Sequence, residues 1–324
     1  MIKNIAVIGC GHWGKNLIRN FNEIGALSAI CDPNLKLAQK YSKQYKVKNL
    51  SFEEILSDET IEGVVLAVPA PLHASMAIMA TKFKKHIYVE KPLAMDIEEG
   101  MKILEAVKEN NVKLMVGHLL QYHPAFKKLL KLITENKIGK IQHLYSNRLS
   151  FGKIRTEEDV IWSFAPHDIS MVLSLAKEQP CFVNTTSASF IQNGLADSAA
   201  INLIFPSGLK ANINVSWINP YKEQKLVVIG ETGMLVFDDM REWQEKLAFF
   251  SNRVSFTDGI PETNKSEIEF LMIEESEPLK NECLHFVDIV NTVSEPLTDG
   301  IEGLNVLKVL NDASESNELY KKTR

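Results

Sequence analysis

The chain lacks the patterns that mark several large classes of protein. Its four cysteines form no C-x-x-C pair and have no metal-type spacing, which favours reduced thiols over a disulfide framework or a zinc site. It contains neither H-E-x-x-H nor G-x-S-x-G, the usual signatures of metal-assisted hydrolysis and of acyl transfer. We therefore expect no bound metal, and redox chemistry is the class that these absences leave open.

An excess of basic charge is missing as well. The 36 lysine and arginine residues stand against 41 aspartate and glutamate residues, a formal net charge of −5, and there is no basic block that would attract nucleic acid or an anionic membrane. No apolar run approaches the roughly 18 residues of a membrane-spanning helix, and the first residues show no signal-peptide pattern. We expect a cytoplasmic protein with no nucleic-acid or membrane partner.

Glycines are concentrated at one informative place near the start of the chain. A short apolar run, Ile5 to Ile8, leads directly into Gly9-Cys10-Gly11-His12-Trp13-Gly14, and an apolar-periodic helix follows. The first glycine permits a tight turn, the second lets the backbone approach a pyrophosphate, and the third lets the helix pack closely on the strand. Any tight strand-to-helix turn uses glycines, but this context on both sides indicates a dinucleotide-binding βαβ unit.

Asp32 indicates which dinucleotide the unit would bind. It closes a second apolar run, Leu27 to Cys31, where a carboxylate can accept hydrogen bonds from the adenosine ribose. Pro33 and Asn34 follow it, and no arginine stands beside it to pair with a 2′-phosphate. The expected cofactor is therefore NAD rather than NADP.

Strand-like runs then alternate with amphipathic segments, which predicts a parallel sheet with helices on both faces. The runs are Gly63 to Val68, His86 to Val89 and Lys113 to Val116, and the amphipathic segments are Pro71 to Phe83 and Ile97 to Asn110.

This alternation stops near residue 120, and with 324 residues the chain has room for two domains. We expect an α/β protein, with a doubly wound parallel Rossmann sheet in residues 1–121 and an α+β domain with an open, mostly antiparallel sheet in residues 122–324. The expected elements of the second domain are a helix from Pro124 to Asn136 and strands at Ile141 to Ser150, Cys181 to Ile191, Ser198 to Phe205, Leu209 to Trp217, Lys225 to Ile229 and Met234 to Phe237.

The end of the chain should complete this second domain. Two helical stretches, Asn281 to Val293 and Ile301 to Leu319, are expected to cover one face of the open sheet. Its other face must be solvated or covered, and burial against a second subunit is a common solution, so we expect a homo-oligomer. The polar stretch from Thr257 to Glu269 is expected to be a mobile surface loop.

Two groups of residues are candidates for chemistry. Glu90-Lys91-Pro92 follows a strand of the first sheet, so Lys91 would project into the crevice of the glycine loop and could stabilise a developing alkoxide. His167, in a segment expected to open a helix from Asp168 to Leu175, could act as a general base near neutral pH. The alternatives are a solvated turn lysine, and a histidine satisfied by local backbone beside an aspartate that favours the helix dipole.

Three further histidines, His73, His118 and His123, lie near the expected edges of the cleft. Because partly buried histidines are common in protein interiors, a structural role is the expectation that competes with ligand contact at each position.

Taken together, the glycine loop, the E-K-P run at 90–92 and the H-D pair at 167–168 resemble the Gfo/Idh/MocA oxidoreductases. The resemblance covers the whole chain and includes Val68-Pro69 with His73, the G-E-T-G-M-L-V-F-D run from Gly230 to Asp238 and the D-G-I-E-G-L run from Asp299 to Leu304. It implies a Rossmann domain followed by a largely antiparallel open-sheet domain, often assembled into dimers or tetramers through that sheet. It also implies that Lys91 is the active-site lysine and His167 the acid/base.

With the resemblance, the expected site can be stated in full. The catalytic residues are Lys91 and His167, and the cofactor would be bound by Gly9, Gly11, His12, Trp13, Gly14, Asp32, Pro69, His73, Glu90 and Lys91.

The chain departs from the family's pattern at two points. The family's D-x-x-x-H motif has an aspartate where this chain has Ser163, which leaves Asp168, Asp159 or the substrate itself as alternative partners of His167. The family also often has an arginine in the segment read here as 117–124, and none is present. The substrate contacts should therefore differ from those of the inositol enzymes.

The segment from Asn147 to Arg155 and the W-S-F-A-P-H-D-I-S run look most like a subgroup associated with bacterial surface-sugar biosynthesis, whose members act on nucleotide-linked amino sugars. Arginine is suited to bidentate contacts with a diphosphate, although ordinary surface cations are the alternative. The expected substrate residues are Arg148, Lys153, Arg155, Ser163 and Asp168.

The resulting hypothesis is an NAD-dependent sugar dehydrogenase acting at the 3-hydroxyl of a nucleotide-linked N-acetylhexosamine or its uronic acid. A free-polyol or inositol-type dehydrogenase and a non-catalytic NAD-bound regulatory protein remain alternatives. The exact sugar and nucleotide, the direction of the reaction and the number of subunits stay open.

Overall fold

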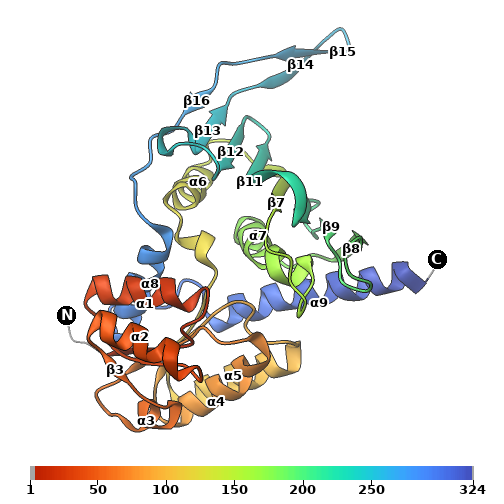
Figure 1. Ribbon diagram of the computed structural model, residues 1–324. Helices are drawn as coiled ribbons and strands as arrows, with labels where there is room; N and C mark the ends of the chain where they lie inside the picture. Colours follow the sequence, from red (N-terminus) through yellow and green to blue (C-terminus); the bar gives the residue numbers. More distant parts are fainter. Residues whose placement is uncertain (1–3, 323–324) are drawn as a thin grey trace. The chain divides into compact units, whose positions relative to one another are not determined.

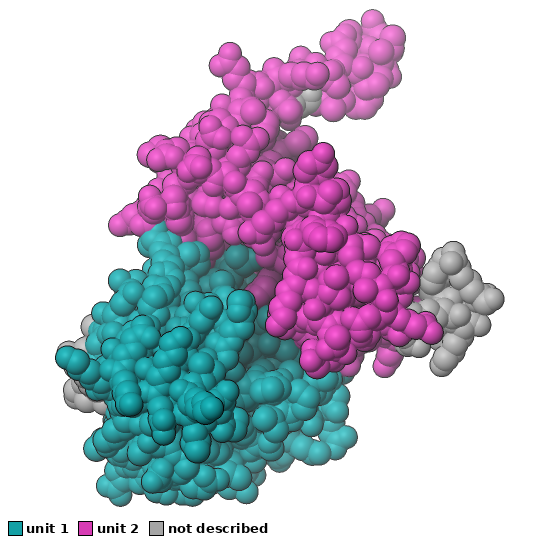
Figure 2. Space-filling model, viewed as in Figure 1, with its two compact units in different colours: residues 1–122, 276–308 teal, residues 123–275, 309–324 magenta. Residues whose placement is uncertain are grey.

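The computed structural model describes residues 4–322, which form two compact units (Figures 1 and 2). The first unit contains the residues up to 122 together with 276–308, and the second contains 123–275 and the residues from 309 on. The expectation that everything beyond residue 121 forms the second domain is therefore wrong for residues 276–308. Helix α8 (Pro278–Val290) places Phe286 edge-on against Phe21 and Tyr88, with ring centroids 6.3 and 5.7 Å apart, and so belongs to the first core.

The first unit is built on a six-stranded sheet in the order β3-β2-β1-β4-β5-β6. Every adjacent pair is parallel, which confirms the predicted Rossmann sheet. The strand order reverses direction between β1 and β4. In sheets of this kind, ligands bind at this point, outside the carboxyl ends of the strands. The strands are β1 (Ile5–Ile8), β2 (Leu27–Cys31), β3 (Lys48–Asn49), β4 (Gly63–Leu66), β5 (His86–Val89) and β6 (Leu114–Val116).

The sequence prediction omits two helices of this unit. Both had a signal in the sequence: α2 packs Ala38, Tyr41 and Tyr45 on the core, and α3 begins with a capping box between Ser51 and Glu54. The helices and 3₁₀ turns that connect the strands are α1 (Gly14–Ile24), α2 (Leu35–Tyr45), α3 (Phe52–Ser57), η1 (Ala70–Leu72), α4 (His73–Lys82), α5 (Ile97–Asn110) and η2 (Leu119–Tyr122).

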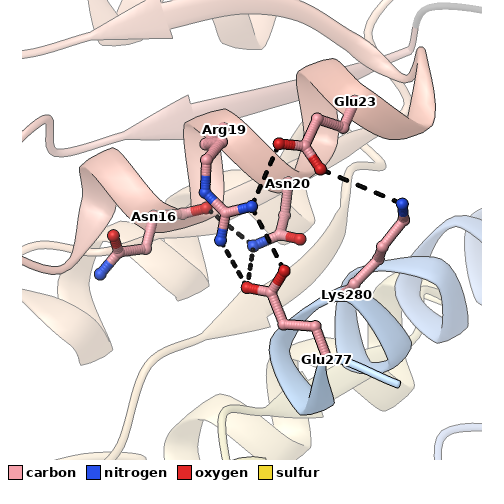
Figure 3. A network of polar contacts seen from close by, with 6 residues as sticks. All are labelled: Asn16, Arg19, Asn20, Glu23, Glu277 and Lys280. Atoms are coloured by element: carbon pink, nitrogen blue, oxygen red, sulfur yellow. Dashed lines mark hydrogen bonds and ion pairs between the residues drawn. The ribbon is translucent and has the colours of Figure 1, made fainter. Parts of the chain in front are cut away.

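A polar network fastens α8 to α1 on the surface of the first unit (Figure 3). Glu277, at the N-cap position of α8, caps no amide of its own helix and instead accepts hydrogen bonds from Arg19 and Asn20, each at 3.2 Å. Arg19 also pairs with Glu23 at 3.1 Å. The Arg19 guanidinium lowers the pKa of Glu277, so this carboxylate favours the folded state in its ionised form.

The second unit contains an eight-stranded sheet in the order β16-β13-β12-β11-β7-β10-β9-β8. All adjacent pairs are antiparallel except β7 with β10, which confirms the predicted α+β domain with a mostly antiparallel sheet. The strands are β7 (Ile141–Phe151), β8 (Phe182–Ala188), β9 (Ser198–Ile204), β10 (Lys210–Ser216), β11 (Ile218–Gly230), β12 (Met234–Asp238), β13 (Leu247–Phe250) and β16 (Glu269–Phe270).

Helices α6 (Pro124–Thr134) and α7 (Val160–Ala176) pack on one face of this sheet. The expectation that the helix near 281–293 covers the sheet is wrong, because α8 belongs to the first unit. Helix α9 (Gly300–Lys322) contributes its later turns, where Ser314 accepts a hydrogen bond from the Trp162 indole at 3.0 Å and Ser316 one from the Thr185 amide at 3.0 Å. None of the helices in residues 4–322 has the length and apolarity needed to cross a membrane.

The opposite face of the second sheet is covered by no helix of its own unit within the described residues, and carries a mixture of polar and apolar side chains. Asn214 donates to Asn147 at 2.9 Å, and Asn147 donates to Glu223 at 2.8 Å, so polar groups bond across neighbouring strands. Tyr145, on the same face, is 42% exposed and stacks on His143. This uncovered face is the surface that the sequence analysis expects to meet a second subunit.

The prediction of a loop from Thr257 to Glu269 is wrong for the first part of that stretch. These residues belong to a β-hairpin formed by β14 (Arg253–Thr257) and β15 (Ile260–Asn264). Asp258 and Gly259 between the strands both have positive φ, 53° and 80°. An Asp-Gly pair in this conformation makes the two-residue turn whose twist matches antiparallel strands.

Candidate active site

The glycine loop between β1 and α1 has the shape that a pyrophosphate requires. A Cβ on Gly9 would lie 2.3 Å from the Ala67 carbonyl oxygen, and a Cβ on Gly14 would lie 1.9 Å from the Gly9 carbonyl oxygen, so both positions exclude any larger residue. A Cβ on Gly11 would meet nothing within 4 Å, which leaves its side of the loop open. Trp13 occupies the N-cap position of α1 and caps no amide with its side chain. The Lys15 and Asn16 amides donate to the Gly11 and Trp13 carbonyls at 3.2 and 2.8 Å, so α1 offers an anion chiefly the positive end of its dipole.

Asp32 lies at the end of β2 beside this loop. Its Oδ2 accepts a hydrogen bond from the Cys10 amide at 2.6 Å, and its Oδ1 accepts one from the Asn34 amide at 2.8 Å. These bonds orient the carboxylate and leave further lone pairs for ribose hydroxyls. Burial and the Asp32 charge raise the pKa of the neighbouring Cys10 and Cys31 thiols to about 12 and about 11, so both stay protonated and unreactive at neutral pH.

A cavity of about 700 Å³ joins these features on the first unit. None of the described residues that line it is an arginine, which fits a cofactor without a 2′-phosphate. Its volume lies within the range of small-molecule sites, and its walls are mainly apolar. The residues present therefore fit NAD, with Gly9, Gly11, Asp32, Pro69 and Leu72 in the lining.

Trp13 links the glycine loop to the tip of β5. Its indole N–H donates to Glu90 Oε1 at 2.6 Å, although the ring itself is 38% exposed. The same carboxylate accepts hydrogen bonds from the Tyr88 hydroxyl at 3.2 Å and from the Lys91 amide at 3.3 Å. The loop that the sequence assigns to the cofactor and the E-K-P run are thus joined through one buried carboxylate, whereas His12 is exposed.

Lys91 follows this carboxylate and precedes Pro92 through a cis peptide bond. The carbonyl oxygen of Pro92 lies 2.7 Å from His73 Nδ1, and the other ring nitrogen of His73 lies 3.0 Å from the Val68 carbonyl oxygen. His73 is 1% exposed and burial lowers its pKa, so the neutral ring donates to one of these two carbonyls and lies against the other. We assign it to holding the segment that carries Lys91, rather than to direct contact with the cofactor.

His167 belongs to the second unit and lies in the middle of α7. The prediction that a helix begins at Asp168 is wrong, because α7 begins at Val160 and continues through Pro166. Asp159 provides the start signal that was missed: its Oδ1 accepts hydrogen bonds from the Ile161 and Trp162 amides at 3.0 and 3.1 Å. Proline inside a helix removes one backbone hydrogen bond, which explains why the sequence favoured a later start.

Ser163 and His167 are four residues apart on α7 and therefore lie on the same face of the helix. Ser163 is buried, at 3% exposed, and occupies the position of the family's aspartate. Both aspartates named from the sequence as alternative partners of His167 have other roles. Asp159 caps the helix, and Asp168 binds Ser146 and Arg148. Asp168 also points along a different face, since adjacent helical residues diverge by about 100°.

The structural alternative named from the sequence placed Asp168 in the first turn of a helix. Because α7 begins at Val160, Asp168 lies in the middle of the helix instead. It is 1% exposed and accepts hydrogen bonds from Ser146 Oγ at 2.6 Å and from Arg148 Nε at 2.5 Å. The pair joins α7 to β7, and it engages Arg148, which the sequence offered to a diphosphate. Of the other two predicted cations, Lys153 is exposed and Arg155 pairs with Glu158 at 3.1 Å.

His118 was among the histidines named from the sequence, but its polar surroundings were not identified. His118 Nδ1 lies 2.6 Å from Glu302 Oε2, and Thr298 Oγ1 donates to the Val116 carbonyl at 2.6 Å, so the D-G-I-E-G-L region packs against β6. Glu282 is fully buried in the same unit. Its signal was present: it stands within the apolar stripe of α8, between Leu279 and Phe286, where a charged residue is unexpected.

Comparison with known proteins gives two family matches. The model described as "Oxidoreductase family, NAD-binding Rossmann fold" matches residues 3–118, and the model described as "GFO/IDH/MocA C-terminal domain" matches residues 126–236. Together they account for both units of the chain apart from its C-terminal segment.

Named relatives are similar over almost the whole chain. UDP-N-acetylglucosamine 3-dehydrogenase of Acidithiobacillus ferrooxidans is 22% identical over 302 residues, 93% of each chain, and its structure matches with a TM-score of 0.87 over 98% of each chain. The scyllo-inositol 2-dehydrogenase (NAD(+)) of Bacillus subtilis is 25% identical over 323 residues, 94% of this chain and 91% of that one. The WlbA dehydrogenase from Bordetella pertussis, solved with NADH and UDP-GlcNAcA, matches with a TM-score of 0.80 at 21% identity over 98% and 97% of the two chains.

Proposed function

The chain belongs to the Gfo/Idh/MocA oxidoreductase family and is an NAD-dependent dehydrogenase; from that premise we propose that its substrate is a nucleotide-linked N-acetylhexosamine or its uronic acid, oxidised at the 3-hydroxyl. The observation that carries the proposal is the first unit's arrangement, in which one buried carboxylate joins the glycine loop to Lys91. It places the lysine at the edge of the sheet where ligands of this fold bind.

Each catalytic side chain has a defined task in this proposal. NAD supplies the acceptor for the hydride that leaves the sugar carbon. The Lys91 ammonium hydrogen-bonds the sugar oxygen and stabilises the negative charge that develops there. His167 accepts the hydroxyl proton at a ring nitrogen, because an imidazole can change its charge near neutral pH. Asp32 binds the ribose hydroxyls, and the open side of Gly11 with the N-terminus of α1 binds the pyrophosphate.

The substrate class is supported by the relatives and by the cations of the second unit. A UDP-N-acetylglucosamine 3-dehydrogenase and the UDP-GlcNAcA-bound WlbA dehydrogenase both match nearly the full chain. Lys153 and Arg155 follow β7 and are the candidates for the diphosphate, whereas Arg148 also serves the structural pair with Asp168. A role in surface-polysaccharide sugar biosynthesis follows from this substrate class.

A free-polyol dehydrogenase is the second candidate, and the similarity to the scyllo-inositol enzyme favours it. Ser163, which replaces the family's aspartate, is the observation that favours a non-catalytic NAD-bound regulatory protein. NADH formation over a panel of UDP- and dTDP-linked sugars, free hexoses and inositols separates all three. The proposal requires turnover that is lost when the nucleotide is removed from the sugar.

The uncovered face of the second sheet supports assembly into a homodimer or homotetramer. Tyr145 is exposed there, among asparagines that bond across the strands, and a second copy of the chain presents the same surface. A cytoplasmic location is proposed with it, since NAD and nucleotide sugars are cytoplasmic metabolites in this scheme.

A further inference from the structure

Glu282, on α8, has no part in the chemistry proposed above. It is 0% exposed, and neither carboxyl oxygen has a hydrogen-bond partner of normal geometry among the described residues. Leu279, Cys283 and Phe286 share its helix face and are buried with it. A carboxylate that is removed from water without partners is so costly that the group normally remains neutral instead.

Among the described groups that face Glu282, the Tyr88 hydroxyl is the one that would favour its ionised form, and this hydroxyl donates to Glu90. Tyr88 and Glu90 face it from β5 and its tip, and Cys283 stands beside it on α8. Glu302, at the start of α9, and Tyr122, in η2, act on it as well. None of these described neighbours is a cation. Burial, and next the charge of Glu90, raise the pKa of Glu282 well above its ordinary value.

Burial raises the pKa of Glu90 as well, but Glu90 has hydrogen-bond donors that Glu282 lacks. Its two oxygens accept from three donors, the Trp13 indole at 2.6 Å, the Tyr88 hydroxyl at 3.2 Å and the Lys91 amide at 3.3 Å. Hydrogen bonds of this kind favour the ionised form of a carboxylate. Because the Tyr88 hydroxyl donates to Glu90, its oxygen is left as an acceptor on the side of Glu282. One proton shared between the two acids therefore belongs on Glu282.

We propose that Glu282 is a positioning residue that keeps its proton while Glu90 is ionised, and so keeps Trp13 of the glycine loop and the Lys91 amide bound to the tip of β5. If Glu282 lost its proton, two negative charges would meet in the interior, and Glu90 could no longer hold both the loop and Lys91 without repulsion. The inference rests on the proposed function only in treating Glu90 and Lys91 as parts of the active site.

The retained proton makes stability depend on pH with a definite sign. In the unfolded chain Glu282 ionises above about pH 4, whereas in the folded protein it stays protonated, so folding takes up a proton. The contribution of Glu282 to the stability of the wild type must therefore decrease as the pH rises, until the pKa of folded Glu282 is reached. Glu282→Gln has the shape of the protonated acid and no proton to take up, so it avoids this loss.

The test is thermal unfolding of the wild type, Glu282→Gln and Glu277→Gln between about pH 5 and about pH 9. The melting temperature of Glu282→Gln should exceed that of the wild type by a margin that grows with pH, at roughly 2–4 °C for each kcal/mol. Glu277→Gln is the matched control on the same helix. Its carboxylate has a lowered pKa because of Arg19, so this variant should melt below the wild type by a margin that stays constant over this range, since both the folded and the unfolded pKa of Glu277 lie below about pH 5.

A pH-independent difference for Glu282→Gln, or a melting temperature below the wild type at high pH, would show that Glu282 is ionised and would overturn the proposal. The wild-type protein provides a second test that needs no variant to fold. Its infrared spectrum at about pH 8 should contain the carbonyl stretch of a protonated carboxyl group, because ordinary acids are ionised at that pH. Absence of that band contradicts the assignment.

The positioning role is tested by NADH affinity, measured by fluorescence from about pH 8 up to the pH at which folded Glu282 loses its proton. The wild type should bind NADH more weakly at the alkaline end, whereas Glu282→Gln should bind with unchanged affinity. Identical alkaline profiles would refute the positioning role. No sugar is present in any of these measurements, so an error in the proposed substrate leaves their outcome unaffected.

Discussion

Lys91 is held in place by its neighbours on both sides. Its amide is bound by Glu90, and the carbonyl after it is bound by His73, a residue that is 1% exposed. These contacts bind the backbone on both sides of Lys91. A change that shortens the side chain should therefore affect turnover without moving the segment.

The first prediction concerns the two catalytic side chains. Lys91→Ala and His167→Ala should each lower turnover, by roughly 10²–10⁴-fold for the general base, while the affinity for NADH stays near that of the wild type. Steady-state kinetics and NADH fluorescence titration measure the two effects. Lys102→Ala, an exposed lysine of α5, is the control and should change neither. Unchanged turnover in both active-site variants would contradict the assignments.

The second prediction concerns the pair of Asp168 and Arg148. Asp168→Ala leaves the Arg148 guanidinium, which is only 11% exposed, without its carboxylate, so the free energy of unfolding should fall by about 3–5 kcal/mol. Denaturant unfolding checks this value. Arg155→Ala removes a pair that is more exposed and should cost about 1 kcal/mol or less. Equal effects of the two substitutions would mean that the buried pair has no special structural role.

Residues whose partners are close in sequence were predictable, and residues whose partners are distant were not. Gly9, Gly14 and Asp32 were identified because the turn, the strand and the acidic residue stand in one short segment. Asp168 was misread because its partners, Ser146 and Arg148, lie on a different strand. For Glu282, a single charge within an apolar stripe predicts burial, but nothing in the sequence shows that it faces Glu90.

At the scale of elements, α7 and the β14–β15 hairpin show how local signals compete. Pro166 made a continuous helix look improbable, yet the Asp159 cap and the apolar residues around it outweigh one lost hydrogen bond. In the hairpin the decisive Asp258-Gly259 signal was in the sequence, but the polar composition around it favoured a loop. Short two-stranded hairpins depend on the turn, so turn chemistry is the better guide there.

The third prediction separates two roles for Asp159. Asp159→Ala removes the cap of α7 and should destabilise the protein by about 1 kcal/mol, whereas Asp159→Asn keeps a capping oxygen and should have little effect on stability or turnover. Thermal unfolding and kinetics measure both. Asp96→Ala, the N-cap of α5, is the matched control, with a similar loss of stability and no change in turnover. A large loss of turnover in Asp159→Asn would instead show that its charge serves His167.

At the scale of the whole molecule, the Rossmann sheet and the antiparallel sheet were both predictable, because strands alternate with helical segments in the first and mostly follow one another in the second. The return of residues 276–308 to the first unit was not. Helix α8 carries an ordinary amphipathic pattern that fits any apolar surface, and its choice of the first core depends on contacts such as Phe286 with Tyr88. Long-range packing of this kind leaves no periodic signal in the sequence.

The fourth prediction concerns assembly. If the uncovered face of the second sheet is the subunit interface, Tyr145→Lys places a charge at its centre and should shift the protein toward the monomer in light scattering. Met101→Lys, at a 58% exposed position on α5, is the control and should leave the molar mass unchanged. A wild-type protein that is already monomeric, or an unaffected Tyr145→Lys, would contradict the interface.

The proposed activity is tested most directly by NADH formation with purified protein, NAD and a panel of UDP- and dTDP-linked N-acetylhexosamines and their uronic acids. The account predicts turnover with at least one nucleotide-linked sugar, loss of that turnover with the free sugar, and a large decrease in Lys91→Ala. Turnover with free inositols or hexoses that is indifferent to the nucleotide would contradict it. So would the absence of NADH formation with every sugar while NAD still binds.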